Sequence, residues 1–192
     1  MATCLKSGFC VAPRKESELR TVAEKVRGVL SDHADIKFFD IIKVLEHKMP
    51  EVCPDFRYEI VEPLELPDRE AEMNPFELCI RIREDVYLKA MNDDGHCRFT
   101  VAHELGHFFL HRMQPLAFGR KAENGNIPTF QNSEWQADVF ARNLLAPFSM
   151  TRGMVPNQIA LLFGVSKEVA NIIAGTQVST IPTGPIQLTL NI

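Results

Sequence analysis

Five consecutive residues, His103-Glu104-Leu105-Gly106-His107, spell H-E-x-x-H, a pattern with two histidines four positions apart and an acid after the first. Four residues turn an α-helix through about 400°, so His103 and His107 face one side and can reach one metal ion. Glu104 lies about 100° from His103, where it is poorly placed as a ligand but can hold a metal-bound water. The pattern predicts a Zn²⁺ site with His103 and His107 as ligands and Glu104 as the catalytic base.

A catalytic zinc ion needs a third protein ligand, and the first candidate is His111, four residues after His107. The metzincin pattern, however, requires Gly at position 110 and His at position 113, where this chain has Leu110 and Met113. We therefore interpret His111 as an imidazolium near the end of its helix, where a positive charge suits the helix dipole.

The better candidate is Glu134, in a second predicted helix that reads S-E-W-Q-A-D-V-F-A-R-N-L-L-A-P. Ser133 and Gln136 form a capping box at its start, and Pro147 ends it. Glu134 and Asp138 are spaced i, i+4 and share a face, so one carboxylate can bind the metal while the other holds a ligand histidine. We predict Glu134 as the third ligand and Asp138 as that partner.

Two long stretches of the chain read R-F-T-V-A-H-E-L-G-H-F-F-L-H and E-W-Q-A-D-V-F-A-R-N-L-L-A-P, and two shorter ones are Gly8-Phe9 and Val86-Tyr87. Together they resemble the ImmA/IrrE-type zinc metallopeptidases of bacteria and their mobile elements. Ala146 departs from the family, whose members often carry Met there, and this difference affects only packing near the site. The resemblance implies the same ligands and the same base as the spacing does.

The resemblance also implies a substrate, namely a helix-turn-helix repressor, commonly of Xre type and encoded nearby, whose cleavage derepresses stress or mobile-element genes. A non-proteolytic zinc-containing regulator or toxin-antitoxin component that binds protein or DNA is the alternative. Glu104 argues against a pure binder, because a zinc scaffold needs no acid at that place. Tyr87 is a candidate oxyanion partner by residue type only, and a structural role for it is favoured.

Composition limits the remaining possibilities. With 192 residues, 45% of them hydrophobic, and a net charge of −4, the chain is expected to form one soluble globular domain. We expect a peptidase domain over residues 1–154 and a helical pair with a tail over 155–192, packed on the same domain. The chain has no apolar run of membrane-spanning length and no signal-peptide core, so we expect a cytoplasmic protein without a membrane partner. Five cysteines without a C-x-x-C pattern indicate reduced thiols.

Hydrophobic periodicity predicts an α+β, mainly helical, zincin-like fold with a small antiparallel sheet. Helices are expected at 16–31 and 39–48, and strands at 56–61 and 78–82, with an exposed loop at 62–76. One of these strands is a candidate to bind substrate as an added strand.

The remaining segments are expected to frame the site or to pack beside it. Residues 119–132, between the two ligand helices, are rich in Gly, Asn and Gln and are expected to form a loop. Helices at 156–163 and 166–174 resemble a helix-turn-helix, with Ser166 as N-cap. The second has one base and one acid, which suits packing better than DNA contacts. Residues 185–192 are a candidate terminal strand.

Overall fold

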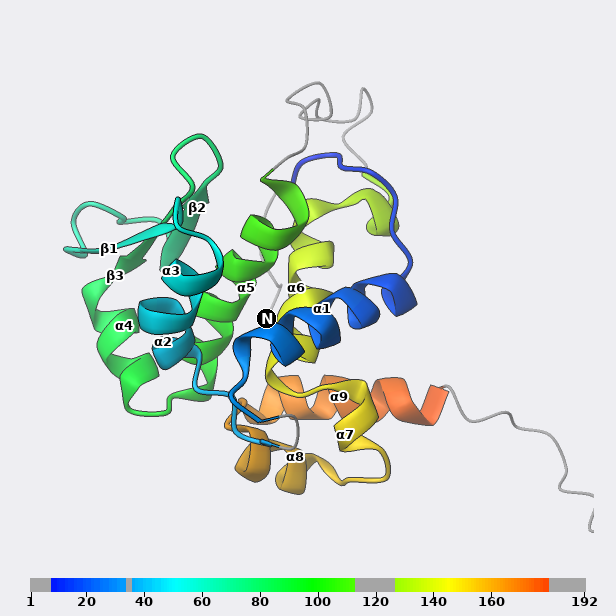
Figure 1. The fold of residues 1–192 in the computed structure, drawn as a ribbon. Coiled ribbons are helices and arrows are strands. Elements are labelled where there is room, and N and C mark those ends of the chain that lie inside the picture. The colour runs from blue at the N-terminus through cyan, green and yellow to red at the C-terminus, as the bar shows by residue number, and fades with distance from the viewer. Residues whose placement is uncertain (1–7, 34–35, 113–126, 180–192) are drawn as a thin grey trace, which may run out of the picture.

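The computed structural model describes residues 8–33, 36–112 and 127–179 (Figure 1). Two long helices lie side by side at its centre, α5 (Gly95–His111) and α6 (Ser133–Leu145). The sheet packs against α5, whereas α1 (Glu16–Leu30) packs against α6. Both predicted ligand helices therefore belong to the interior of the fold.

The other helical segments surround this central pair. The helix predicted at 39–48 continues to residue 52 and contains a π-helical turn, and the helix predicted at 16–31 ends one residue early. The segments are α2 (Ile41–Lys43), the π-helical η1 (Val44–Lys48), α3 (Met49–Val52), α4 (Glu84–Met91), the 3₁₀ turn η3 (Thr129–Gln131), α7 (Phe148–Thr151), α8 (Pro156–Phe163) and α9 (Lys167–Ser179). In the part of the chain described, no helix is long and apolar enough to span a bilayer.

The sheet differs from the antiparallel pair predicted. Its strands are β1 (Arg57–Val61), β2 (Ala71–Asn74) and β3 (Cys79–Arg83), in the order β1-β3-β2. β1 pairs with β3 in parallel, and only β2 pairs with β3 antiparallel. The prediction was wrong because alternating residues indicate a strand but not its direction. β2, inside the predicted loop, forms a hairpin with β3 and leaves the opposite edge of β3 to β1.

Close packing of α5 on α6 depends on Gly106. A Cβ atom there would lie 3.1 Å from both the Cα and the carbonyl oxygen of Ala137, and 3.2 Å from Cδ1 of Phe140. Such distances are shorter than ordinary van der Waals contact, so the lack of a side chain at Gly106 lets the two backbones approach. This approach brings the start of α6 over the middle of α5.

The C-terminal helices are attached to the start of α5 through Arg98, which is 1% exposed. Its guanidinium stacks on the ring of Phe38 and donates hydrogen bonds to the carbonyl oxygens of Phe39 and Gly164, at 2.8 and 2.9 Å. Gly164 ends α8 with a φ of 62°, and the backbone N–H of Val169 donates to the Ser166 hydroxyl, as the predicted N-cap requires.

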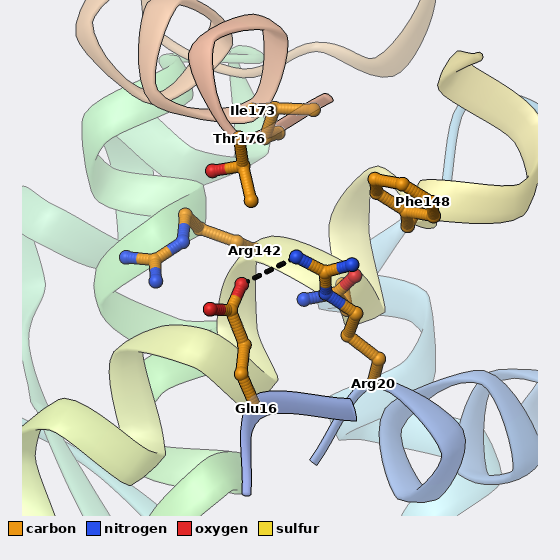
Figure 2. A pocket seen from close by; sticks show the side chains of 7 residues that line it. Glu16, Arg20, Arg142, Phe148, Ile173 and Thr176 are labelled. Carbon is orange, nitrogen blue, oxygen red and sulfur yellow. Dashed lines mark hydrogen bonds and ion pairs between the residues drawn. The ribbon is translucent and has the colours of Figure 1, made fainter. Parts of the chain in front are cut away.

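A small hollow lies where α1, α6, α7 and α9 meet (Figure 2). Glu16 and Arg20 form an ion pair of 2.6 Å at its wall, and the Arg20 guanidinium lies 4.2 Å from the centre of the Phe148 ring. None of the predicted site residues lines it. Residues 119–126, the expected strand at 185–192 and Cys4 lie outside the described residues. The described cysteines form no disulfide with one another.

Candidate metal centre

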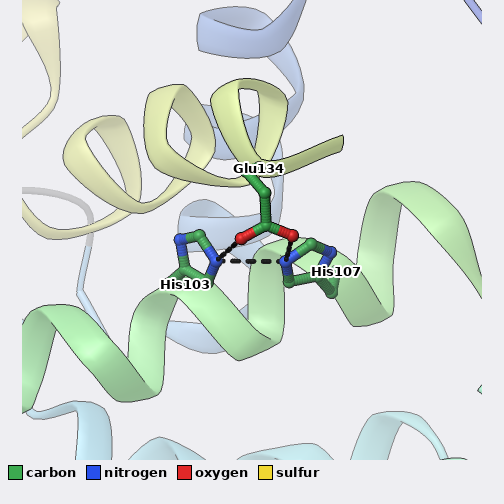
Figure 3. A group of neighbouring side chains, drawn as sticks. All are labelled: His103, His107 and Glu134. Carbon is green, nitrogen blue, oxygen red and sulfur yellow. Dashed lines mark hydrogen bonds and ion pairs between the residues drawn. The ribbon is translucent and has the colours of Figure 1, made fainter. Parts of the chain in front are cut away.

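Three side chains from the two central helices converge on one point (Figure 3). His103 and His107 point from successive turns of α5, and their Nε2 atoms are 3.0 Å apart. Glu134, in the first turn of α6, places one carboxylate oxygen 3.4 Å from each of these nitrogens. The structure thus brings together all three residues that the sequence nominates as metal ligands.

Asp138 lies one turn after Glu134 and contacts the Nδ1 side of the His103 ring, away from the Nε2 atom that faces the cluster. Its Oδ1 atom is 2.8 Å from Nδ1 of His103, which therefore donates its proton to the carboxylate. In the neutral ring, a proton on Nδ1 leaves the lone pair of Nε2 directed at the cluster. This geometry is the one predicted for a second carboxylate that orients a ligand histidine.

Electrostatics within the cluster favour charge separation. Burial raises the pKa of Glu134, but hydrogen bonds and charge interactions with His103 and His107 outweigh it and hold the pKa well below its ordinary value. Burial lowers the pKa of His103, but its contacts with Asp138 and Glu134 and the nearby Glu104 raise it to about 9. The cluster therefore carries an ionised carboxylate and, before a metal binds, a protonated His103.

Glu104 is buried, with 6% of its surface exposed. Within the described parts of the chain, no group donates a hydrogen bond to its carboxylate. It interacts electrostatically with His103, its neighbour in the chain. A buried carboxylate without a protein donor beside two imidazoles is placed to accept a proton from a small molecule held there.

His111 does not have the role predicted for it. It is the last residue of α5, as expected, but burial and the neighbouring His107 lower its pKa to about 4. An uncharged imidazole cannot act as an imidazolium on the helix dipole, so that interpretation is wrong. His111 instead places Nδ1 3.1 Å from Nδ1 of His107 and Nε2 3.2 Å from Oε1 of Gln136.

The start of α6 also differs from the capping box predicted. Asn132 is the N-cap, and its Oδ1 accepts hydrogen bonds from the backbone N–H groups of Glu134 and Trp135 at 2.8 and 3.3 Å. Ser133 is the first helical residue, and its hydroxyl accepts from the backbone N–H of Phe9 at 2.9 Å. The N-terminal segment therefore lies against the turn that carries Glu134, and a Cβ at Gly8 would lie 3.0 Å from Cγ of Glu134. The contact between the N-terminal segment and the start of α6 was not predicted from the sequence. The glycine at position 8 is the residue that could have indicated such a close approach.

Tyr87 is engaged elsewhere. Its hydroxyl donates to Oε1 of Glu46 on η1, and this bond, with burial, raises the pKa of Tyr87 to about 12. The structural role favoured for Tyr87 agrees with this contact.

The donor set fits a divalent metal of the zinc type. Two imidazole nitrogens and one carboxylate, with all three ligand atoms within 4.8 Å of one another, form a typical catalytic zinc set. When both histidines are neutral, two Nε2 lone pairs face each other at 3.0 Å, and a bound cation offsets their repulsion.

Comparison with known proteins identifies the family. Residues 60–172, more than half of the chain, match the peptidase M78 family, described as the IrrE N-terminal-like domain. The chain belongs to this family. The resemblance to ImmA/IrrE-type metallopeptidases is thus confirmed, and the M78 match supports an enzyme of metallopeptidase type. The comparison with curated proteins finds no match.

The M78 match begins within β1 and ends within α9. It contains both helices of the cluster, whereas α1 and the segment around Gly8 precede it. The N-terminal contacts with the start of α6 therefore come from outside the matched region.

Proposed function

We propose that this M78 protein is a cytoplasmic zinc endopeptidase in which His103, His107 and Glu134 hold the metal. One observation carries the proposal: a His-His-Glu cluster lies next to a buried glutamate that accepts no hydrogen bond from the described protein groups. Zinc, when bound, acidifies water and polarises the scissile carbonyl as a Lewis acid.

Glu104 is the proposed catalytic base. Its carboxylate takes the proton of the attacking water and passes it to the nitrogen of the departing amine. Asp138 holds His103 through Nδ1, so that the ring keeps one orientation throughout. These are the roles that the sequence analysis assigned to the two residues.

We propose β2, which the sequence analysis did not predict, as the edge to which an extended substrate segment adds. Of the two strands considered there, the one at 78–82 corresponds to β3, which is paired on both sides and offers no edge. β2 is an edge strand of the sheet and packs against α5. Glu70, directly before β2, binds α5 by accepting a hydrogen bond from the Thr100 hydroxyl at 2.9 Å and by pairing with His96 at 2.9 Å. These contacts fix the strand beside the helix that carries H-E-x-x-H, and main-chain pairing would align a peptide there.

The proposed substrate is a helix-turn-helix repressor, in keeping with the family resemblance. A segment that adds to a strand edge must be extended, so the bond cut lies in a linker or a locally unfolded region of the repressor. We assign the C-terminal helices to packing rather than to DNA binding. The exposed residues of α9 include one base and one acid, Lys167 and Glu168, which gives little attraction for phosphate.

The test is a comparison of Glu104→Gln with Glu51→Gln, an identical chemical change at an exposed position of α3. Glu104→Gln should keep the fold and bind zinc yet lose proteolysis, because an amide cannot accept the proton of water. Glu51→Gln should cleave like the wild type. Mass spectrometry of a repressor captured by Glu104→Gln, and of its wild-type products, identifies the partner and the bond.

The same experiment separates the peptidase from the regulator. If Glu104→Gln retained the full biological effect while cleaving nothing, a binding function would replace the proposal. If repressors stayed intact and another protein were cut, the peptidase would stand and the repressor would not.

A further inference from the structure

Beyond the proposed ligands, a partly buried chain of hydrogen bonds runs from the N-terminal segment to His107. Gln136 is fully buried on α6, two residues after Glu134. Its Nε2 atom lies 2.9 Å from the carbonyl oxygen of Ala12 and 2.8 Å from that of Phe130. Both contacts are to acceptors, so the amide nitrogen must occupy this position, and Oε1 must face the other way.

The orientation of Gln136 determines the proton position on His111. Oε1 of Gln136 is 3.2 Å from Nε2 of His111, and since Oε1 only accepts, Nε2 carries the hydrogen. A neutral His111 then presents the Nδ1 lone pair to Nδ1 of His107 at 3.1 Å. A hydrogen on Nδ1 of His107 turns this contact into a hydrogen bond, whereas two facing lone pairs would repel each other, so the contact favours the His107 tautomer with its hydrogen on Nδ1.

We propose that His111 and Gln136 are positioning residues that fix the tautomer and the ring orientation of His107, so that its Nε2 lone pair points at the metal position. The inference rests on the proposed metal site. It adds a role for His111 and Gln136, the positioning of His107. Asp138 orients His103 in the same way, through a hydrogen bond to Nδ1. Each histidine of the cluster is therefore held through Nδ1 by a different partner. One partner is an anion and the other a neutral imidazole backed by an amide.

The chain of contacts also explains why His111 is not itself a ligand in this arrangement. Both of its ring nitrogens are engaged, one with His107 and one with Gln136. Gln136, at the other end of this chain of contacts, donates to the carbonyl oxygen of Ala12 in the N-terminal segment. The same segment also contacts Ser133, which directly precedes Glu134. Two of the three proposed ligands are thus supported from this one segment.

The test measures zinc affinity, by competition with a chelator, in His111→Phe, His111→Asn and a control. Phe keeps the ring but removes the acceptor, so zinc affinity should fall about 10- to 100-fold, the usual cost of losing such a partner. Asn places its Oδ1 close to the former Nδ1 and should restore most of the loss. Asn143→Leu is the control, since it removes a buried hydrogen bond of α6 that reaches no ligand.

The proposal is overturned if His111→Phe binds zinc like the wild type, or if Asn143→Leu weakens binding equally. It also fails if His111→Asn does not restore binding, because a ligand or a general packing role would then explain His111. Long-range ¹H–¹⁵N spectra of the zinc-loaded wild type supply a test without substitutions. His107 should carry its hydrogen on Nδ1 and His111 on Nε2. A hydrogen on Nδ1 of His111 instead would refute the proposed hydrogen-bond chain from Gln136 through His111 to His107. None of these measurements depends on proteolysis, so they stand apart from the peptidase assignment.

Discussion

Replacing Gly106 by Ala tests whether close helix packing sets the geometry of the metal centre. The added methyl group would meet the backbone of Ala137 at 3.1 Å and the fully buried ring of Phe140 at 3.2 Å. Backbone atoms cannot rotate away, so α6 must shift by a few tenths of an ångström. Glu134 lies one turn before Ala137 and moves with it.

The magnitude follows from two opposing effects. Alanine in place of glycine favours the helix by about 0.8–1 kcal/mol. Overpacking a filled interface costs about 1–3 kcal/mol, so the net change lies between almost none and a loss of about 2 kcal/mol. Gly28→Ala in α1 is the matched control, because a Cβ there has nothing within 4 Å and contributes only the helical gain. The two variants should therefore differ by about 1–3 kcal/mol.

Urea denaturation of the metal-free proteins measures the free energy of unfolding, and chelator competition measures zinc affinity. We expect Gly106→Ala to lose both stability relative to Gly28→Ala and affinity for zinc. Gly28→Ala should bind zinc like the wild type. If Gly106→Ala were as stabilising as Gly28→Ala and bound zinc normally, helix proximity at this glycine would not position Glu134, and the reasoning would be refuted.

Three further outcomes are expected at the cluster. Elemental analysis should find one zinc per wild-type chain and little or none after alanine replaces any one of His103, His107 or Glu134; full occupancy without Glu134 would contradict the ligand set. Asp138→Asn should weaken zinc binding about 10- to 100-fold in chelator competition, and an unchanged affinity would reduce Asp138 to a surface residue. The pKa of His103, raised to about 9, means that the metal-free protein holds a proton there at pH 7.5 that the metal must displace. Calorimetry in buffers of different ionisation enthalpy should therefore detect its release, and affinity should rise with pH up to about 9; binding without proton release would exclude a charged His103.

The features that sequence reasoning predicts here are those that depend on local spacing. The i, i+4 spacing of His103 and His107 and of Glu134 and Asp138 gives the shared helix faces, which the structure turns toward each other. Helix ends follow from residues such as Pro147 and Ser166, close in the chain to the groups they affect. Local stereochemistry determines the shared faces and the helix ends, whereas the packing of α5 on α6 turns the two faces toward each other.

What sequence reasoning missed depends on contacts between distant segments. β1 pairs with the edge of β3 that β2 leaves open, so its parallel pairing depends on the position of β2. The residues of β1 give no information about that position. Ser133 was expected to cap α6, but its hydroxyl binds Phe9, 124 positions away in the chain. A charged His111 was expected from the sequence. Its burial and its proximity to His107, which lower its pKa, arise only in the folded protein.

Arg98 has a consequence for how relatives of this protein can diverge. Its hydrogen-bond acceptors at Phe39, Phe163 and Gly164 are main-chain carbonyls, so side chains at the first two positions can change without touching those bonds. Gly164 is different, because a Cβ there would lie 2.5 Å from the ring of Phe38. Relatives that keep an arginine at position 98 should therefore keep the backbone path of the turn between α8 and α9 even where the residues of that turn have changed. Recombination that exchanged the C-terminal helices would succeed only between chains sharing that path.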